Sequence, residues 1–371
     1  MAVIGIHSLF ATAAIRPVAH EHDVPPPLTT HRLLTDWQFA PVVTAGLAAA
    51  AAAYLLGIVL VRRRHPSRPW PIARTGAFFA GLAVIAVATE SGLAAYDDVL
   101  FWVHMWQHLL LLMVAPPLLI LGEPLTLLLH ASRNPVHRWA VRLLRSRPIQ
   151  WVTHPLVGVS AYTVTVVVTH LTSFMNLVLT NSTVHDVEHV WYLAAGYLYF
   201  LPLLGREPIR WRLTFPLRLF LLFLAMPVDT FTGVVLLQTS YEPFPAYIGR
   251  RDWGPSLLDD LHAGGAVMWI GGDGIMLVIM FAAFVAVLAG RGKMDMGRWL
   301  ESLRAARFAA LGAASGVGVQ PPAENTRDGA GTDTDVDQQL AAYNAYLARL
   351  HAMEEHDSRG EQHSTTTGGS S

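Results

Sequence analysis

The chain has 371 residues and a formal net charge of −1; 53% of its residues are hydrophobic, only 14% are charged, and the mean hydropathy is +0.38. A soluble domain has about a quarter of its residues charged, so this composition excludes a purely soluble protein and predicts a surface that largely faces lipid. Cysteine is absent, which excludes disulfides, thiolate metal sites, iron–sulfur clusters and covalently attached c-type haem.

The first 36 residues precede the first long apolar run. Residues 1–14 are apolar, but no basic stretch comes before them, so they resemble a secretory signal only weakly. We expect residues 1–36 to form an exported tail or a weak signal.

Seven apolar runs follow, each long enough to cross a membrane as a helix of about 20 residues. Uninterrupted runs such as Ala45–Ala53 lack the period-two alternation that a transmembrane barrel requires. We therefore predict an all-α fold, a polytopic bundle of seven transmembrane helices within residues 37–290. The predicted spans are Trp37–Val61, Thr75–Ala95, Val99–Leu121, Pro155–Val178, Val187–Leu204, Phe215–Leu237 and Ala263–Ala289.

Arginine residues in the loops predict the orientation of these spans, because short loops rich in Arg stay in the cytoplasm. The loops after the first, third and fifth runs hold thirteen arginines, and the opposite loops hold only Arg250 and Arg251. The N-terminus is therefore expected outside and the C-terminus inside.

Residues 291–371 begin with a basic stretch and become rich in Gly, Pro, Asp and Thr from Ser315 onward. This composition predicts a cytoplasmic, mostly disordered tail. Leu340, Tyr343, Leu347 and Leu350 recur at helical spacing, which fits either one short amphipathic helix or chance periodicity in an unfolded tail.

Ionisable side chains within the runs gather toward the outer ends of the spans. Such groups are unfavourable inside a bilayer, so each is a functional candidate. His104 and His108 share one helix face, and His185 and His189 repeat this spacing around Glu188. Imidazoles with thioether sulfur nearby and no thiolate suit copper, especially Cu(I). The candidate metal residues are His104, His108, His170, His185, Glu188, His189, Met226, Asp229 and His262.

Single members of this set also have simpler interpretations. A lone membrane histidine is as often a hydrogen-bonding link between helices as a ligand, which applies to His170 and His262. Glu188 and Asp229 are the carboxylates expected to accept the second N–H of a ligating histidine. Met105, Met113 and Met268 are expected to be packing residues. Convergence of four or five imidazoles at one depth favours a site over packing alone.

Pro116 and Pro117 lie one to two turns inward of His108. Both lack the amide hydrogen that continues an α-helix, so we expect them to open the backbone ladder of the third span and to kink it.

Several short motifs occur in a fixed order along residues 41–291. They are His104–His108, Ala115-Pro116-Pro117, Gly122-Glu123-Pro124, His154-Pro155, His170-Leu171-Thr172, His185–His189, Ala225-Met226-Pro227, Tyr247, Asp259–Gly265 and Met268-Trp269. Together they resemble the CtaG family of membrane proteins associated with caa-type cytochrome c oxidase assembly. The resemblance implies an assembly role, copper delivery and oxidase subunits as partners. One departure is Asp260-Leu261-His262, where the family often has Asp-Gln before the paired glycines; His262 either adds a ligand or replaces an amide.

The leading interpretation is a copper-handling assembly factor. One alternative is a b-type membrane haem protein, in which two facing imidazoles such as His108 and His170 bind the iron. The other is a transporter that uses Asp229, Asp273 and histidines as a proton or ion relay. We expect no enzyme, because no paired acid–base constellation, nucleophile motif or nucleotide loop is present. The expected partners are membrane lipid and oxidase subunits, and no nucleic acid.

Overall fold

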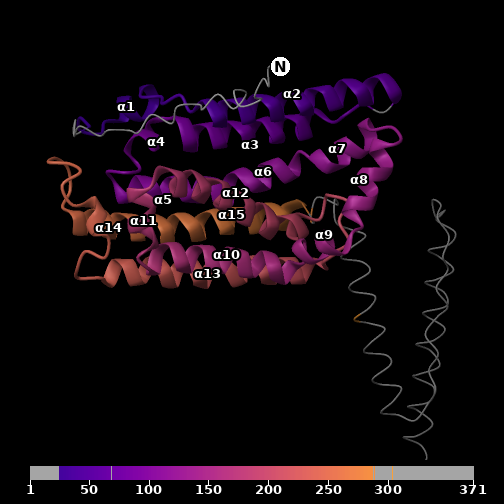
Figure 1. The fold of residues 1–371 in the computed structure, drawn as a ribbon. Helices are drawn as coiled ribbons and strands as arrows, with labels where there is room; N and C mark the ends of the chain where they lie inside the picture. Colours follow the sequence, from indigo (N-terminus) through magenta and orange to yellow (C-terminus); the bar gives the residue numbers. More distant parts are fainter. Residues whose placement is uncertain (1–24, 68, 287, 289–302, 304–371) are drawn as a thin grey trace, which may run out of the picture. The chain divides into compact units, whose positions relative to one another are not determined.

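The computed structural model describes residues 25–67, 69–286, 288 and 303, and no strand occurs among them (Figure 1). The all-α prediction is confirmed for these residues. The predicted short helix in the C-terminal tail, and residues 1–24 of the predicted N-terminal tail, lie outside them. The helices are α1 (Thr30–Thr35), α2 (Pro41–Arg64), α3 (Ile72–Glu90), α4 (Gly92–Tyr96), α5 (Phe101–Leu109), η1 (Leu110–Val114), α6 (Ala115–Leu121), α7 (Pro124–Ala131), α8 (Val136–Leu144), α9 (Arg147–Val152), α10 (Pro155–Leu171), α11 (Phe174–Thr180), α12 (Ser182–Leu204), α13 (Phe215–Gln238), η2 (Pro245–Tyr247), α14 (Leu257–Ala266), η3 (Val267–Gly271) and α15 (Gly272–Ala286).

By length and composition, five helical stretches could cross a membrane. They are Pro41–Arg64, Ile72–Tyr96, Phe101–Ala131, Phe215–Gln238 and Leu257–Ala286. The bent pair of α10 and α11 makes a sixth if it is counted as one broken span. Helix α12 has 23 residues but begins with polar turns, which lower its hydropathy. The chain is thus a multi-pass membrane protein, and the count of seven spans and their orientation stay predictions.

Several predicted spans differ in their bounds from the observed helices, and two of the differences affect the segments that carry His170 and His185. The sequence predicts one span over Pro155–Val178, whereas the chain bends by 77° between α10 and α11. At the bend the Thr172 hydroxyl accepts a hydrogen bond from the Phe174 amide at 3.1 Å, and such side-chain bonds compete with the helical ladder. Helix α12 begins at Ser182, five residues before the predicted start, so His185 belongs to the helix.

The stretch from α5 to α7 lies at the centre of the packed helices. Within its most apolar window 56% of the residues are buried, against 11% for α2. Helix α6 packs against α3 and α12, while α5 packs against α14 (Figure 1). Helix α10 in turn contacts α12 and α13. The histidine-bearing parts of α5, α10 and α12 therefore belong to one buried core.

The backbone ladder of this central stretch widens into a π-helix over Leu110–Val114, directly before the proline pair. The Ala115 amide donates to the Leu110 carbonyl, five residues back. Pro116 has no amide hydrogen, so the Leu112 carbonyl has no helical donor in an α register. The predicted opening of the ladder is therefore confirmed, and the kink stays a prediction.

Helix α12 approaches the freed carbonyl closely. A Cβ on Gly196 would meet the Leu112 carbonyl oxygen and, at 2.8 Å, Cγ of Pro116. Only glycine leaves room for this approach, because any larger residue would overlap the backbone of the π-helix. The contact sets the distance between α12 and the central stretch.

The orientation can be tested with reporters fused after Pro66, Pro148 and Asn181. The first two sites lie in Arg-rich segments and are expected in the cytoplasm, and Asn181 is expected outside. Paired fusions to a fluorescent protein and to alkaline phosphatase give complementary signals at each site. If Pro148 and Asn181 reported the same side, α10 and α11 would not cross the membrane and the seven-span prediction would be wrong.

Candidate metal centre

The first turn of α5 is held by a residue from a distant helix. The N-cap residue Leu100 offers no side-chain hydrogen bond. Instead the two carboxylate oxygens of Asp260, in α14, accept hydrogen bonds from the Phe101 amide at 3.0 Å and the Trp102 amide at 3.1 Å. The backbone amides at a helix start lack intrahelical acceptors, so a carboxylate there stabilises the helix. His104 and His108 therefore project from a fixed helix end.

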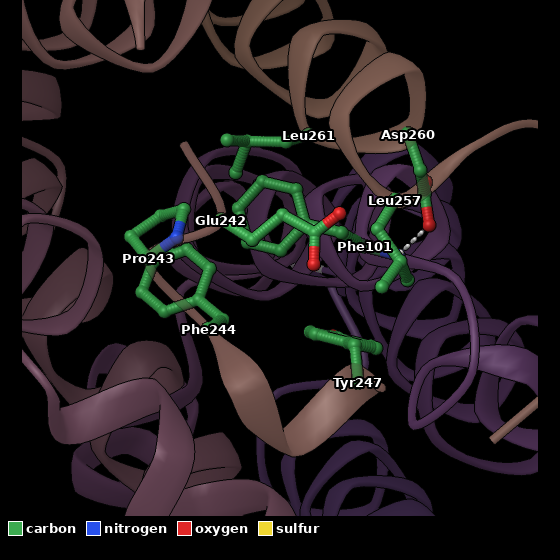
Figure 2. A pocket seen from close by; sticks show the side chains of 8 residues that line it. All are labelled: Phe101, Glu242, Pro243, Phe244, Tyr247, Leu257, Asp260 and Leu261. Atoms are coloured by element: carbon green, nitrogen blue, oxygen red, sulfur yellow. Dashed lines mark hydrogen bonds between the residues drawn. The ribbon is translucent and has the colours of Figure 1, made fainter. Parts of the chain in front are cut away.

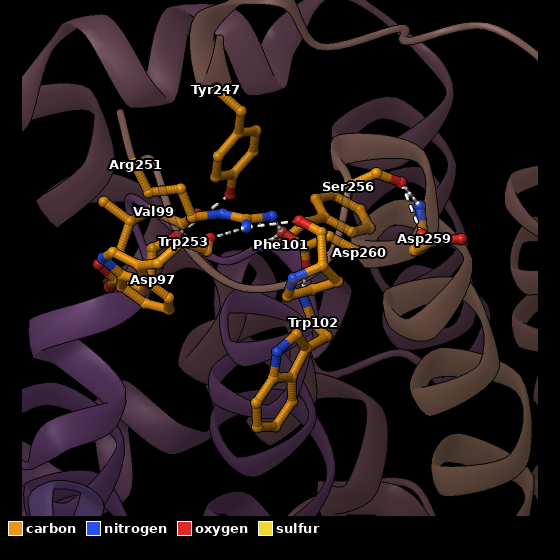
Figure 3. A network of polar contacts seen from close by, with 11 residues as sticks. Asp97, Val99, Phe101, Trp102, Tyr247, Arg251, Trp253, Ser256, Asp259 and Asp260 are labelled. Carbon is orange, nitrogen blue, oxygen red and sulfur yellow. Dashed lines mark hydrogen bonds and ion pairs between the residues drawn. The ribbon is translucent and has the colours of Figure 1, made fainter. Parts of the chain in front are cut away.

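The side chain of Arg251 holds together the chain around this helix start (Figure 3). Arg251 forms an ion pair with Asp260 at 3.2 Å and donates to the Val99 carbonyl at 3.1 Å. It also donates to the carbonyls of Trp253 and Pro255, each at 2.6 Å. The segment between α13 and α14 is thus tied to the turn that precedes α5.

We expect Asp260→Asn to lower the free energy of unfolding by about 2 kcal/mol, since an amide retains one acceptor oxygen but leaves a buried donor without its partner. The control is Asp259→Asn, an exposed residue one position earlier, which should change stability by less than about 0.5 kcal/mol. Thermal unfolding in detergent measures both. Equal losses for the two variants would contradict the assigned role of Asp260.

A small pocket lies beside this network (Figure 2). One of its two acidic residues, Asp260, already accepts hydrogen bonds from two backbone amides and pairs with an arginine. None of the clustered histidines lines it, so it is distinct from the candidate centre. The lining residues are Phe101, Glu242, Pro243, Phe244, Tyr247, Leu257, Asp260 and Leu261.

Five imidazoles from three helices converge further along α5. The ring centroids of His104 and His108 lie 4.1 Å apart, and those of His104 and His185 lie 5.5 Å apart. His185 and His189 are separated by 4.4 Å, and His108 and His170 by 5.6 Å. The structure therefore brings these five imidazoles together, as the sequence predicts, and their role as metal ligands stays a prediction.

Glu188 lies between the two histidines of α5. Its Oε2 is 3.8 Å from Nε2 of His104 and 3.7 Å from Nε2 of His108, and its side chain is 1% exposed. These separations are longer than the donor–acceptor distance of a hydrogen bond. They approach the spacing of about 3.4 Å between two ligands of one tetrahedral ion. The sequence predicts Glu188 both as a candidate metal residue and as a carboxylate that orients a ligating histidine, and this geometry suits a direct ligand.

Many polar atoms of the cluster are buried without a hydrogen-bond partner among the described residues. They are both ring nitrogens of His104 and of His108, Nε2 of His170, His185 and His189, and both carboxylate oxygens of Glu188. Buried polar groups are normally paired, and an unpaired one costs free energy. A cation coordinated by Glu188 and by the single lone pair that each neutral ring offers would satisfy several of these atoms.

The tautomer of His170 is fixed by its surroundings. Its Nδ1 lies 2.8 Å from the Val166 carbonyl, which only accepts, so Nδ1 carries the hydrogen. Nε2 of the neutral ring then carries the lone pair, and it is buried without a hydrogen-bond partner among the described residues. His108 is held differently, because its ring stacks on Tyr192 with a centroid distance of 3.8 Å. Both rings are thus oriented without using the nitrogens that face the cluster.

One member of the cluster was not predicted. Asp97, in the turn after α4, is 4% exposed and places its Oδ2 3.4 Å from Nε2 of His185. Burial raises the pKa of this carboxyl well above its ordinary value, and the charge of Asp98 acts in the same direction. Asp97 lies outside every apolar run, so no membrane criterion singles it out; only its position beside the third span is visible in sequence.

Other candidates lie apart from the cluster. Nε2 of His262 donates to the Thr239 carbonyl at 2.9 Å and so links α14 to the end of α13. Met226 packs at the edge of the core. Asp229 accepts a hydrogen bond from the Tyr162 hydroxyl at 2.6 Å, and no bond to a histidine is found for it among the described residues.

Asp229 nevertheless borders the cluster through a second cavity. This cavity is lined on one side by His108 and His170. The remaining polar or sulfur-bearing lining residues are Met105, Met113, Tyr192, Asp229 and Met268. The thioethers near the imidazoles are therefore those expected only to pack, and Met226 is not one of them.

Comparison with known proteins matches residues 52–289 to the family described as cytochrome c oxidase caa3 assembly factor (Caa3_CtaG). Uncharacterized proteins of Mycobacterium bovis and Mycobacterium tuberculosis are each 31% identical over 257 residues, which cover 67% of this chain and 39% of each relative. One of Mycobacterium leprae is 28% identical over 275 residues, 71% of this chain and 41% of the relative. The chain spans about two fifths of the length of these relatives. No solved structure matches.

Proposed function

Because the chain belongs to the cytochrome c oxidase caa3 assembly factor family, we propose that it serves oxidase assembly by holding copper in the cluster of five imidazoles and Glu188. Copper is then cargo, destined for the oxidase. The oxidase subunits are the partners to which the cargo passes.

The observation that carries this proposal is the set of buried lone pairs without partners. A core that packed histidines only for stability would pair their nitrogens with hydroxyls or carbonyls. Here such bonds exist for Nδ1 of His170, while the nitrogens that face Glu188 have none among the described residues. An arrangement that is unfavourable without a cation supports a role in binding one.

The donor types favour copper among the common metals. Imidazole nitrogen with carboxylate oxygen suits Cu(II), while imidazole with thioether suits Cu(I). The cluster provides the first combination through His104, His108 and Glu188. The adjoining cavity provides the second, because Met105 and Met113 line it beside His108. A site with both donor sets accommodates copper in either oxidation state.

The two alternatives have less support. A b-type haem needs two imidazoles facing each other across a flat macrocycle, whereas these rings crowd around one carboxylate. A relay through the acidic groups would use Asp229 and Asp273, and each accepts a hydroxyl hydrogen bond at 2.6 Å from Tyr162 and Thr230 respectively. Those carboxylates therefore have structural partners.

The test is metal analysis of the full-length protein purified in detergent and exposed to Cu²⁺ or, with ascorbate, to Cu⁺. We expect each chain to retain at least one copper ion through gel filtration and to show no Soret band in its absorption spectrum. Cells that lack the protein should contain oxidase with reduced copper content. A protein that retains no copper, or one that carries haem, would overturn the proposal.

A further inference from the structure

The histidine cluster contains two overlapping groups of metal-ligand atoms that share one residue. Asp97, His185 and His189 form the first group, which we name the receiving group. His104, His185 and Glu188 form the second, the holding group. Within each group the candidate ligand atoms lie within 4.8 Å of one another. His185 belongs to both.

The two groups differ in their place along the candidate membrane spans. The Asp97 side chain is 5% exposed and lies between the spans Ile72–Tyr96 and Phe101–Ala131, whereas His104 lies inside the second of them. In the holding group the His104 and Glu188 side chains are 0% and 1% exposed, while His189 of the receiving group is partly buried. An ion arriving from the end of the helices where Asp97 lies therefore meets the receiving group before the holding group.

Ligand atoms on one small ion lie about 3.4 Å apart in a tetrahedral site. Asp97 Oδ2 and His185 Nε2 are already at 3.4 Å. His104 Nε2 and Glu188 Oε2 are at 3.8 Å. In each group one pair of ligand atoms is therefore close to the spacing of a single ion, and the third ligand atom lies within 4.8 Å of both.

We propose that Asp97, His185 and His189 receive a copper ion, which then passes to His104 and Glu188 while His185 stays bound. This inference rests on the proposed function and adds the path by which copper reaches His104 and Glu188. It gives Asp97 a role as the carboxylate ligand of the receiving group.

The step is a ligand exchange without redox chemistry. The bonds from Asp97 oxygen and His189 nitrogen to the ion break as bonds from His104 nitrogen and Glu188 oxygen form. The oxidation state of the ion does not change, and the net charge of the ion with its ligands stays the same, because one carboxylate replaces the other and one neutral imidazole replaces the other. The ion is held by at least one ligand throughout, which lowers the barrier to transfer through a poorly solvated core.

The experiment follows uptake of Cu²⁺, supplied as the chloride, by the full-length protein in detergent. Rapid-freeze electron paramagnetic resonance gives the loading rate, and gel filtration with metal analysis gives the final stoichiometry. Asp97→Asn should slow loading at least tenfold and leave the stoichiometry unchanged. Glu188→Gln should lower the stoichiometry and leave a copper signal with the receiving-group ligands. The matched control is Asp186→Asn, an exposed carboxylate beside His185, which should load like the wild type.

Three results would overturn the inference. If Asp97→Asn loads as fast as the wild type, no receiving group exists. If it loses as much copper as Glu188→Gln, Asp97 is a ligand of a single site. If the wild type takes up no copper at all, the proposed function fails together with the inference. Circular dichroism and gel filtration of each variant confirm that the helical fold is intact.

Discussion

Replacing both His104 and His108 by alanine is expected to reduce copper retention to background. Both rings flank Glu188, at 3.8 and 3.7 Å, so the double variant removes the two imidazoles that α5 contributes. Loss of a group that only orients a ligand already weakens metal binding about 10–100-fold. Loss of two ligands should therefore weaken copper binding by more than this factor. Equilibrium dialysis against a copper buffer measures the effect.

The same variant should be as stable as the wild type without metal, or more stable. Its alanines remove four buried ring nitrogens that have no hydrogen-bond partner among the described residues, and such atoms are unfavourable in a core. The matched control is His130→Ala, an exposed histidine in α7, which should retain copper fully. If the double variant kept its copper, or if His130→Ala lost it, the assignment of the cluster would be wrong.

Gly196→Ala is expected to be the most damaging of the small substitutions. The new methyl group would overlap the Leu112 carbonyl oxygen and press on Pro116, so α12 must move away from the central stretch. Overpacking of this kind costs about 3 kcal/mol at the upper end of its range. Because α12 carries Glu188 and His189, copper retention should fall as well.

Gly46→Ala in α2 is the control for this substitution. A Cβ there meets nothing within 4 Å, and alanine is a better helix former than glycine by roughly 0.5–1 kcal/mol. The control should therefore unfold at the same temperature as the wild type or higher. Thermal unfolding in detergent compares the two variants. A Gly196→Ala protein as stable as Gly46→Ala would show that the close approach is not required.

Helical periodicity explains why much of the cluster was predictable. Residues four apart share a face, so His104 with His108, and His185 with His189, could be paired from sequence. The two pairs are expected to lie close together because both occur near the outer ends of their spans. The lack of an amide on Pro116 likewise predicted that the ladder would open there.

The remaining features depend on contacts between distant segments. Asp97 joins the cluster only because the turn after α4 folds against α12, and no local pattern encodes that contact. His262 and Met226 share the residue types of a copper site, yet their helix faces point to other neighbours. The break at Thr172 has a local signal, a hydroxyl that competes for the backbone, but threonine is common within apolar helices.

The carboxylate of Asp260 has a consequence for the timing of biogenesis. It is 159 positions later in the chain than Phe101, whose amide it holds. At a synthesis rate of about 5–20 residues per second, the start of α5 therefore waits roughly 10–30 s for its partner. A nascent chain that has made both imidazoles of α5 still lacks the ordered helix start that presents them. Under the proposed function, competence to bind copper is thus delayed until α14 has been made.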